Sequence, residues 1–176
     1  MKEKNIEVLG DGRHIKLLSK DGWEFVERVN VKGIVVILAI TDDEKIVLVE
    51  QYRPPIDKNV IEMPAGLVGD IGGFEDEQME TAARRELLEE TGYEAETMKL
   101  FTEGPISAGL SREVISFYFA KGLKKVHQGG GDETEDIIVH EVPLRSAEEW
   151  IKSKTESGIL IDPKIYIGLY FSNRLL

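Results

Sequence analysis

Hydrophobic and polar residues mostly alternate in parts of the N-terminal region, which is the spacing expected for β-strands with one buried face. Residues 13–19 and 23–31 show this spacing on either side of the turn signal Lys20-Asp21-Gly22. The run Gly33–Ile40 is continuously apolar and rich in Val and Ile, so it predicts a buried strand. Lys45–Tyr52 should return beside it as the second strand of a hairpin.

The remaining pattern adds short strands and three helices. Glu75–Thr91 contains strong helix formers and is followed by Gly92, a residue suited to closing a helix. Ser146 and Glu149 have capping-box spacing for a helix to about Lys154, and Asp162-Pro163 should open a last helix. Further strands are predicted at 60–63, 97–102, 114–120 and 136–142. Many strands with few helices indicate the α+β class.

The length of 176 residues and the 41% hydrophobic content predict one domain over 1–176, in which residues 1–32 hold the N-terminal strands. Residues 1–12 are polar, and we expect them to be partly mobile. No apolar run approaches the about 20 residues that span a bilayer, and Met1–Asn5 is not followed by the apolar stretch of a signal peptide. Cysteine is absent, so disulfide and thiolate chemistry are excluded. We expect a cytoplasmic protein without a membrane partner.

The formal net charge of −11 argues against a general nucleic-acid binder, which needs a basic surface. An acidic enzyme can still bind a phosphorylated small molecule where metal ions and a few arginines neutralise it. The acidity is equally compatible with simple solubility.

Three carboxylates gather on the helix that ends at Thr91. At about 100° per residue, Glu86, Glu89 and Glu90 fall within an arc of about 100°. Oxygen ligands on a rigid scaffold suit Mg²⁺ or Mn²⁺ and do not suit zinc or copper. A solvated acidic helix face is the commoner meaning of three glutamates, and the spacing alone favours that interpretation.

The neighbouring residues favour the metal site. Glu77, seven intervening residues and the run Arg85-Glu86-Leu87-Leu88-Glu89-Glu90-Thr91-Gly92-Tyr93 resemble the Nudix box. The glycine that opens the box corresponds to Gly66, eleven residues before Glu77 instead of six, so the loop Leu67–Asp76 is about five residues longer than the family pattern. The resemblance implies a mixed sheet sandwiched between helices. It also implies an enzyme that hydrolyses a nucleoside diphosphate linked to another group.

The resemblance to the Nudix family assigns a role to each carboxylate. Glu86 and Glu90 match the main ligands of Mg²⁺ or Mn²⁺, and Glu89 matches a third. The backbone carbonyl of Ala65 matches a further ligand. Glu77 and Arg85 match a supporting ion pair that fixes the loop against the helix.

A second acidic group follows three glycines in Gly129–Asp136. Taken alone, it is a flexible surface turn. It resembles the loop before the late strand of ADP-ribose pyrophosphatases, which makes Glu133 the general base and Glu135 a metal ligand. The glycines would then act as a hinge that brings the base in when substrate and metal are present. Glu89 is the alternative base, as in some relatives.

Segments outside the box resemble the nucleotide-sugar branch of the family. There the resemblance implies that an aromatic residue stacks on the base and arginines contact the phosphates, which suits the fork of the guanidinium group. A strand aromatic in the core is an equally good interpretation of Trp23. The substrate-binding residues implied are Trp23, Arg28, Arg53, Glu62, Ala108, Gly109 and Glu113.

The expected substrate is therefore a nucleoside diphosphate sugar, with ADP-ribose first. Ala108 stands where ADP-ribose-type members usually carry proline, so GDP-mannose or a mixture of nucleotide sugars stays open. Members of this branch are typically homodimers that share the site through their N-terminal strands. Two alternatives are a Nudix hydrolase for nucleoside triphosphates, dinucleoside polyphosphates or capped RNA, and a non-catalytic nucleotide-sensing module. The intact carboxylate set argues against the sensing module.

Overall fold

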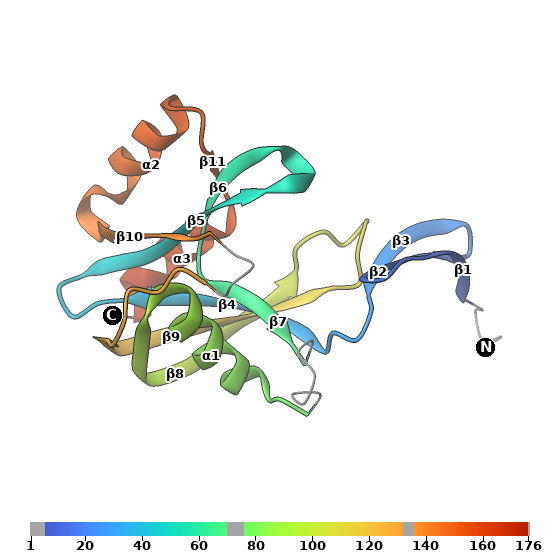
Figure 1. The fold of residues 1–176 in the computed structure, drawn as a ribbon, viewed down its shortest axis with the longest axis horizontal. Helices are drawn as coiled ribbons and strands as arrows, with labels where there is room; N and C mark the ends of the chain where they lie inside the picture. Colours follow the sequence, from blue (N-terminus) through green and yellow to red (C-terminus); the bar gives the residue numbers. More distant parts are fainter. Residues whose placement is uncertain (1–5, 70–75, 132–135, 176) are drawn as a thin grey trace.

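A small sheet projects from the main body of the protein (Figure 1). The computed structural model describes residues 6–69, 76–131 and 136–175. The small sheet is antiparallel and consists of β1 (Ile6–Asp11), β2 (Ile15–Lys20) and β3 (Trp23–Arg28). The expectation of a partly mobile segment over 1–12 is wrong for Ile6–Asp11. That segment pairs with β2 along its length, with an irregularity between Val8 and Gly10.

The large sheet is mixed and has the order β11-β6-β5-β4-β9-β8, with β10 paired to β5 and β7 paired to β4. The β4–β9 and β11–β6 pairs are parallel, and the other pairs are antiparallel. Its strands are β4 (Gly33–Ile40), β5 (Lys45–Arg53), β6 (Lys58–Glu62), β7 (Ala65–Val68), β8 (Tyr93–Pro105), β9 (Val114–Lys125), β10 (Ile138–Pro143) and β11 (Leu160–Ile161). The helices are α1 (Met79–Thr91), α2 (Ala147–Glu156) and α3 (Lys164–Leu175).

The predicted hairpin of β4 and β5 exists only next to its turn. The two strands pair through Ala39 with Val47 and Ile40 with Ile46, and then they separate. Beyond that point β7 lies beside β4 in place of β5, and β6 lies beside β5 in place of β4. The opposite edges of β4 and β5 pair with β9 and β10. The divergence opens the sheet where β7 enters, directly beside α1.

Both faces of β4 are buried, which explains its continuous apolar run. Val36, Leu38 and Ile40 belong to a core cluster with Ile151 of α2 and Ile165 of α3. The alternate residues pack instead against α1 in a second cluster, namely Val35, Ile37 and Ala39 with Ala82, Ala83 and Leu87. The predicted fold class, a mixed sheet sandwiched between helices with an N-terminal antiparallel region, is confirmed.

The helix ends follow the sequence signals in part. Gly92 closes α1 with φ 74°, and its N–H donates to Leu88 O at 2.8 Å. Asp162 caps α3 by accepting the N–H of Lys164 at 2.7 Å. Ser146 precedes α2, but its hydroxyl donates to Pro143 O, so the predicted capping box does not form. Within the described ranges, no helix is long and apolar enough to cross a membrane.

We predict that Ile165→Ala lowers the free energy of unfolding by about 2–5 kcal/mol, because it leaves a cavity between α3 and the sheet. Ile165 is fully buried, whereas its neighbour Tyr166 is 52% exposed. Tyr166→Ala is therefore the matched control and should change stability little. Urea denaturation of both variants measures the difference, and equal losses would contradict the packing described here.

Candidate active site

Two carboxylates of α1 meet the backbone of β7. Glu90 is 2% exposed, and its Oε2 accepts the backbone N–H of Ala65 at 3.1 Å. A Cβ added at Gly66 would lie 1.9 Å from the carboxyl carbon of Glu86. Any other residue at this position would require the Glu86 side chain to move. Because β7 is fixed by its pairing with β4, Glu86 and Glu90 converge on one dipeptide about twenty residues away in sequence.

Arg85 holds the helix, the loop and two of the carboxylates together. Its guanidinium donates to both carboxylate oxygens of Glu77 at 3.1 and 3.2 Å and to Leu67 O at 3.2 Å. It also donates to Glu86 at 2.8 Å and to Glu89 at 3.0 Å. Burial lowers the pKa of Arg85, but the surrounding glutamates outweigh it and raise the pKa above its ordinary value. The structure thus brings the predicted supporting pair, Glu77 and Arg85, into direct contact.

The donors at this junction fit a hard divalent cation. Carboxylate oxygens beside a backbone segment are the ligand type that Mg²⁺ and Mn²⁺ prefer. In the parts of the chain that the structure describes, no three acidic or histidine side chains gather closely enough to hold an ion. Glu133 and Glu135, assigned as base and ligand, lie outside the described residues. Among the described residues, the helix and Ala65–Gly66 bring together carboxylate and backbone groups of the type that such an ion binds.

Gly130, Gly131 and Ile137 connect the end of α1 with the start of β10. Gly130 N–H donates to Glu90 O at 2.9 Å, and Gly131 N–H donates to Glu89 O at 3.2 Å. On the far side of the segment, Ile137 N–H donates to Gly130 O at 3.3 Å. Two of the three glycines predicted to be a hinge, Gly130 and Gly131, are thus hydrogen-bonded to the carboxylate-bearing turn.

The strand that follows this segment is fixed to the sheet by Glu50. This buried carboxylate accepts hydrogen bonds from Asn59 at 3.1 Å and from Lys154 at 3.4 Å, and it pairs with His140 Nε2 at 2.8 Å. Burial is the largest influence and raises the pKa of Glu50. The hydrogen bonds from Asn59, His140 and Lys154 together outweigh it, so the pKa lies below its ordinary value.

The N-terminal sheet contacts the loop between β8 and β9. Trp23 Nε1–H donates to Gly109 O at 3.0 Å, and Arg28 pairs with Glu113 at 2.6 Å. Trp23 is 65% exposed, so the interpretation of Trp23 as a core aromatic is wrong. The structure therefore brings together residues that the sequence assigned to substrate binding from two distant segments.

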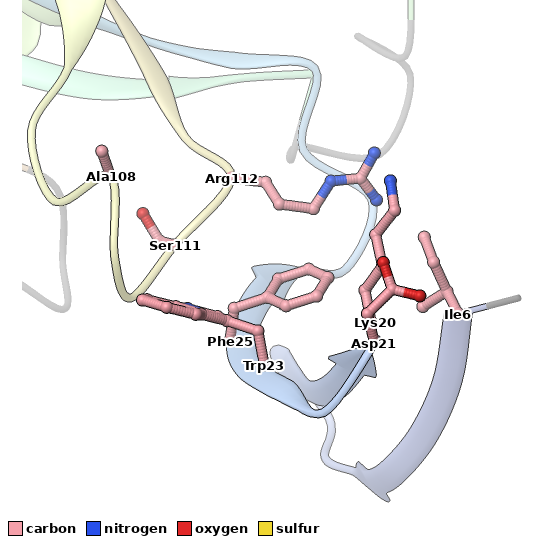
Figure 2. A pocket seen from close by; sticks show the side chains of 8 residues that line it. All are labelled: Ile6, Lys20, Asp21, Trp23, Phe25, Ala108, Ser111 and Arg112. Atoms are coloured by element: carbon pink, nitrogen blue, oxygen red, sulfur yellow. The ribbon is translucent and has the colours of Figure 1, made fainter. Parts of the chain in front are cut away.

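Two cavities lie along this contact. The first, of about 300 Å³, combines Trp23 and Phe25 of β3 with Ala108, Ser111 and Arg112 of the loop (Figure 2). The second, of about 350 Å³, includes Arg28, Glu113 and again Arg112.

Arg112 lines both cavities and was missed from the sequence. It stands between Ser111 and Glu113, in a loop already singled out, but its pairing with Glu27 at 3.0 Å is visible only in the fold.

Arg53 and Glu62 form a separate pair. Arg53 Nε donates to Glu62 Oε2 at 2.6 Å across the β5–β6 ladder. Burial raises the pKa of Glu62, although Arg53 acts in the opposite direction. Within the described residues, the structure places this pair outside the linings of the two cavities. The predicted substrate-binding residues therefore fall into two groups.

Comparison with known proteins places this arrangement in a family. The model of the NUDIX domain matches residues 31–158, which include α1, β7 and the central strands. The chain belongs to the NUDIX family. It is a Nudix hydrolase, and enzymes of this family generally use divalent metal ions.

Several relatives have names that indicate their activities. The chain is 43% identical over 146 residues to the methanol dehydrogenase activator of Bacillus methanolicus, covering 82% of this chain and 74% of that protein. It is 35% identical over 129 residues to the ADP-ribose pyrophosphatase of Bacillus subtilis, covering 73% and 67% of the two chains. It is 32% identical over 123 residues to the GDP-mannose pyrophosphatase of Escherichia coli K12, covering 69% and 64%.

A solved structure supports the fold. The crystal structure of an ADP compounds hydrolase superposes with a TM-score of 0.73 over 97% of this chain and 90% of that chain. The sequence identity is 21%, so the similarity concerns the fold alone. It extends beyond the Nudix box to the N-terminal sheet and the C-terminal helices.

We predict that Glu77→Gln lowers the free energy of unfolding by about 1–3 kcal/mol with or without Mg²⁺, because it removes a charged partner from the half-buried Arg85. The Glu77 side chain is only 1% exposed. Glu80→Gln is the matched control, since the Glu80–Arg84 pair lies on the exposed side of the same helix. It should cost about 0.5 kcal/mol or less. Chemical denaturation gives both values, and similar losses would argue against a supporting role for Glu77.

Proposed function

We propose that the protein hydrolyses the pyrophosphate bond of nucleoside diphosphate sugars with Mg²⁺ or Mn²⁺, and that ADP-ribose is its main substrate. The products are then AMP and ribose 5-phosphate. One observation carries the proposal: the carboxylates of Glu86 and Glu90 meet the Ala65–Gly66 backbone in a chain with a Nudix box. GDP-mannose is the alternative substrate, because relatives named for either activity are similar to this chain.

The metal ligands we propose are Glu86, Glu89, Glu90, Glu135 and the carbonyl of Ala65. A divalent ion held there neutralises phosphate oxygens and activates water for in-line attack. The side chains of the described ligands already face partners of opposite charge or polarity, namely Arg85 and the Ala65 amide. Their geometry is therefore largely set before any ion binds.

We assign the general base to Glu133. The alternative, Glu89, accepts a hydrogen bond from Arg85 at 3.0 Å, so one of its two carboxylate oxygens is already engaged and is less available to take a proton from water. This contact supports Glu133 over Glu89. The role of Glu133 follows from its resemblance to the late acidic loop of ADP-ribose pyrophosphatases.

The nucleotide is assigned to the contact between the N-terminal sheet and the loop 106–113. Trp23 has its indole N–H engaged by Gly109 while most of its surface is exposed, which leaves an aromatic surface for a nucleobase. Arg28 and Glu113 offer a charged and a hydrogen-bonding group beside it. Arg53, held by Glu62, is assigned to the pyrophosphate. The acidic net charge favours such a small substrate over nucleic acid.

Incubation of the purified protein with ADP-ribose and GDP-mannose, each with Mg²⁺ or Mn²⁺, tests the proposal by chromatographic separation of the products. We expect AMP and ribose 5-phosphate from ADP-ribose, with a smaller kcat/KM for GDP-mannose. Glu86→Gln should lower kcat/KM by about 10-fold or more, because it removes a ligand. Absence of any phosphomonoester product from either sugar would end the proposal.

The same assay separates the two candidate bases. Glu133→Gln should lower kcat by about 100-fold or more while the metal concentration for half-maximal activity stays nearly unchanged. Normal turnover by this variant, together with a large loss in Glu89→Gln, would transfer the role to Glu89.

We further propose a homodimer formed through β1–β3 in the cytoplasm. Supporting this, the small sheet exposes several large apolar side chains on its two faces, whose exposed fractions lie between 39% and 65%, and exposed apolar surface favours association. They are Ile6, Val8, Leu9, Ile15, Leu17 and Trp23.

Sedimentation velocity should report a dimer that Val8→Glu converts to a monomer, because a charge on this surface must be desolvated at the interface. Tyr166→Glu is the control, since Tyr166 is 52% exposed on α3 against 55% for Val8 on β1. A wild-type protein that sediments as a monomer at every concentration would exclude the dimer.

A further inference from the structure

The last turn of α1 receives hydrogen bonds from outside the helix. An α-helix leaves its final carbonyl groups without partners inside the helix. Here the carbonyls of Glu89 and Glu90 accept the N–H groups of Gly131 and Gly130, at 3.2 and 2.9 Å. These two helix residues are also the ones whose side chains the proposed function assigns to the metal. We call residues Gly129–Gly131 the glycine clasp.

The close approach of the glycine clasp to α1 requires residues without side chains. Gly129 has φ +72° and Gly130 has φ +117°, backbone conformations that L side chains rarely adopt. A Cβ at Gly129 would lie 2.5 Å from the carbonyl oxygen of Glu90, which is a backbone atom that cannot rotate away. The approach of this segment to α1 therefore depends on glycine for steric reasons at Gly129 and for conformational reasons at Gly130.

The clasp also connects α1 to the central sheet. The carbonyl of Gly130 accepts the N–H of Ile137 at 3.3 Å, and β10 begins at the next residue. Strand β10 pairs with β5 from Ile138 onward. One residue thus hydrogen-bonds both to the carboxylate-bearing turn and to the chain entering the sheet.

Both the side chain and the backbone of Glu90 are therefore hydrogen-bonded to other segments. Its carboxylate accepts the N–H of Ala65 from β7, and its carbonyl accepts the N–H of Gly130. A rotation of the last turn of α1 would break the second bond and move the carboxylate relative to Ala65–Gly66. The position of a ligand of this kind depends on such supporting contacts.

We propose that the glycine clasp is a positioning segment of the metal site, which fixes the last turn of α1 so that Glu89 and Glu90 face a divalent cation. The inference rests on the proposed function and deepens it. It assigns a role to backbone N–H groups that no side-chain motif records. The clasp acts through Glu89 and Glu90 and does not itself touch the substrate.

Mn²⁺ binding to the full chain without substrate, followed by electron paramagnetic resonance of the free ion, tests the proposal independently of activity. Gly129→Ala and Gly130→Ala should each weaken Mn²⁺ binding by about 10-fold or more. Turnover of ADP-ribose at subsaturating metal should fall in parallel, and KM for ADP-ribose at saturating metal should change less than twofold. Gly158→Ala is the matched control, because Gly158 has φ +88° and nothing within 4 Å of an added Cβ.

The results distinguish failure of the proposed function from failure of the clasp proposal. Wild-type protein that binds no Mn²⁺ and cleaves no nucleotide sugar overturns the proposed function itself. Wild-type binding with unchanged affinity in both clasp variants overturns the clasp alone, as does an equal loss in Gly158→Ala, which would reflect general strain. Should circular dichroism show Gly129→Ala to be unfolded, Gly130→Ala decides, since it meets no atom closer than 4.0 Å.

Discussion

The approach of α1 to β7 is the constraint on which the candidate site depends. Gly66 has no side chain, so the carboxylate of Glu86 occupies the space that a Cβ would fill. Glu90 is buried at the same place and is satisfied by the Ala65 amide. Buried carboxylates without partners are costly, and here the backbone amide and the Arg85 guanidinium supply those partners. Packing and electrostatics therefore act on the same few atoms.

Arg85 explains how a chain with a net charge of −11 tolerates three glutamates close together at one side of α1. It contacts Glu77, Glu86 and Glu89 at once, which offsets much of their mutual repulsion. The guanidinium suits this position because it is planar, always charged and able to donate several hydrogen bonds. A lysine would offer the charge without the geometry.

The sequence predicted the parts of the molecule that local rules control. The burial of β4, the helix ending at Gly92 and the cap of Asp162 on α3 follow from periodicity and terminal residues. The start of α1 did not, since the structure begins this helix at Met79 and the predicted Glu75 lies outside the described residues.

The sequence did not predict strands β1, β7 and β11. Strands β7 and β11 pair with strands distant in sequence, and β1 lacks a clear alternation of apolar and polar residues. β7 has four residues, one of which is Gly66, and β11 has two. The separation of β4 from β5 is also a tertiary effect, since β7 takes the place of β5 beside the first half of β4.

The candidate site was likewise predicted where local sequence determines it and missed where tertiary contacts determine it. The Nudix box identified the carboxylates of α1, because its residues are fixed relative to one another by one helix. The pairing of Arg28 with Glu113 spans 85 residues, so no local pattern reports it. Arg112 and the contacts of the glycine clasp were likewise invisible, since they arise from backbone proximity across the fold.

The surface assigned to the nucleotide is assembled from two segments that do not include the box. The backbone N–H of Val26 donates to Leu110 O at 2.8 Å, and Trp23 and Arg28 add side-chain contacts on either side of it. The segments proposed to bind the nucleotide and the helix proposed to hold the metal are thus different parts of the chain. A substitution in the loop 106–113 or in β3 can therefore alter one surface while it leaves the contacts between α1 and β7 unchanged.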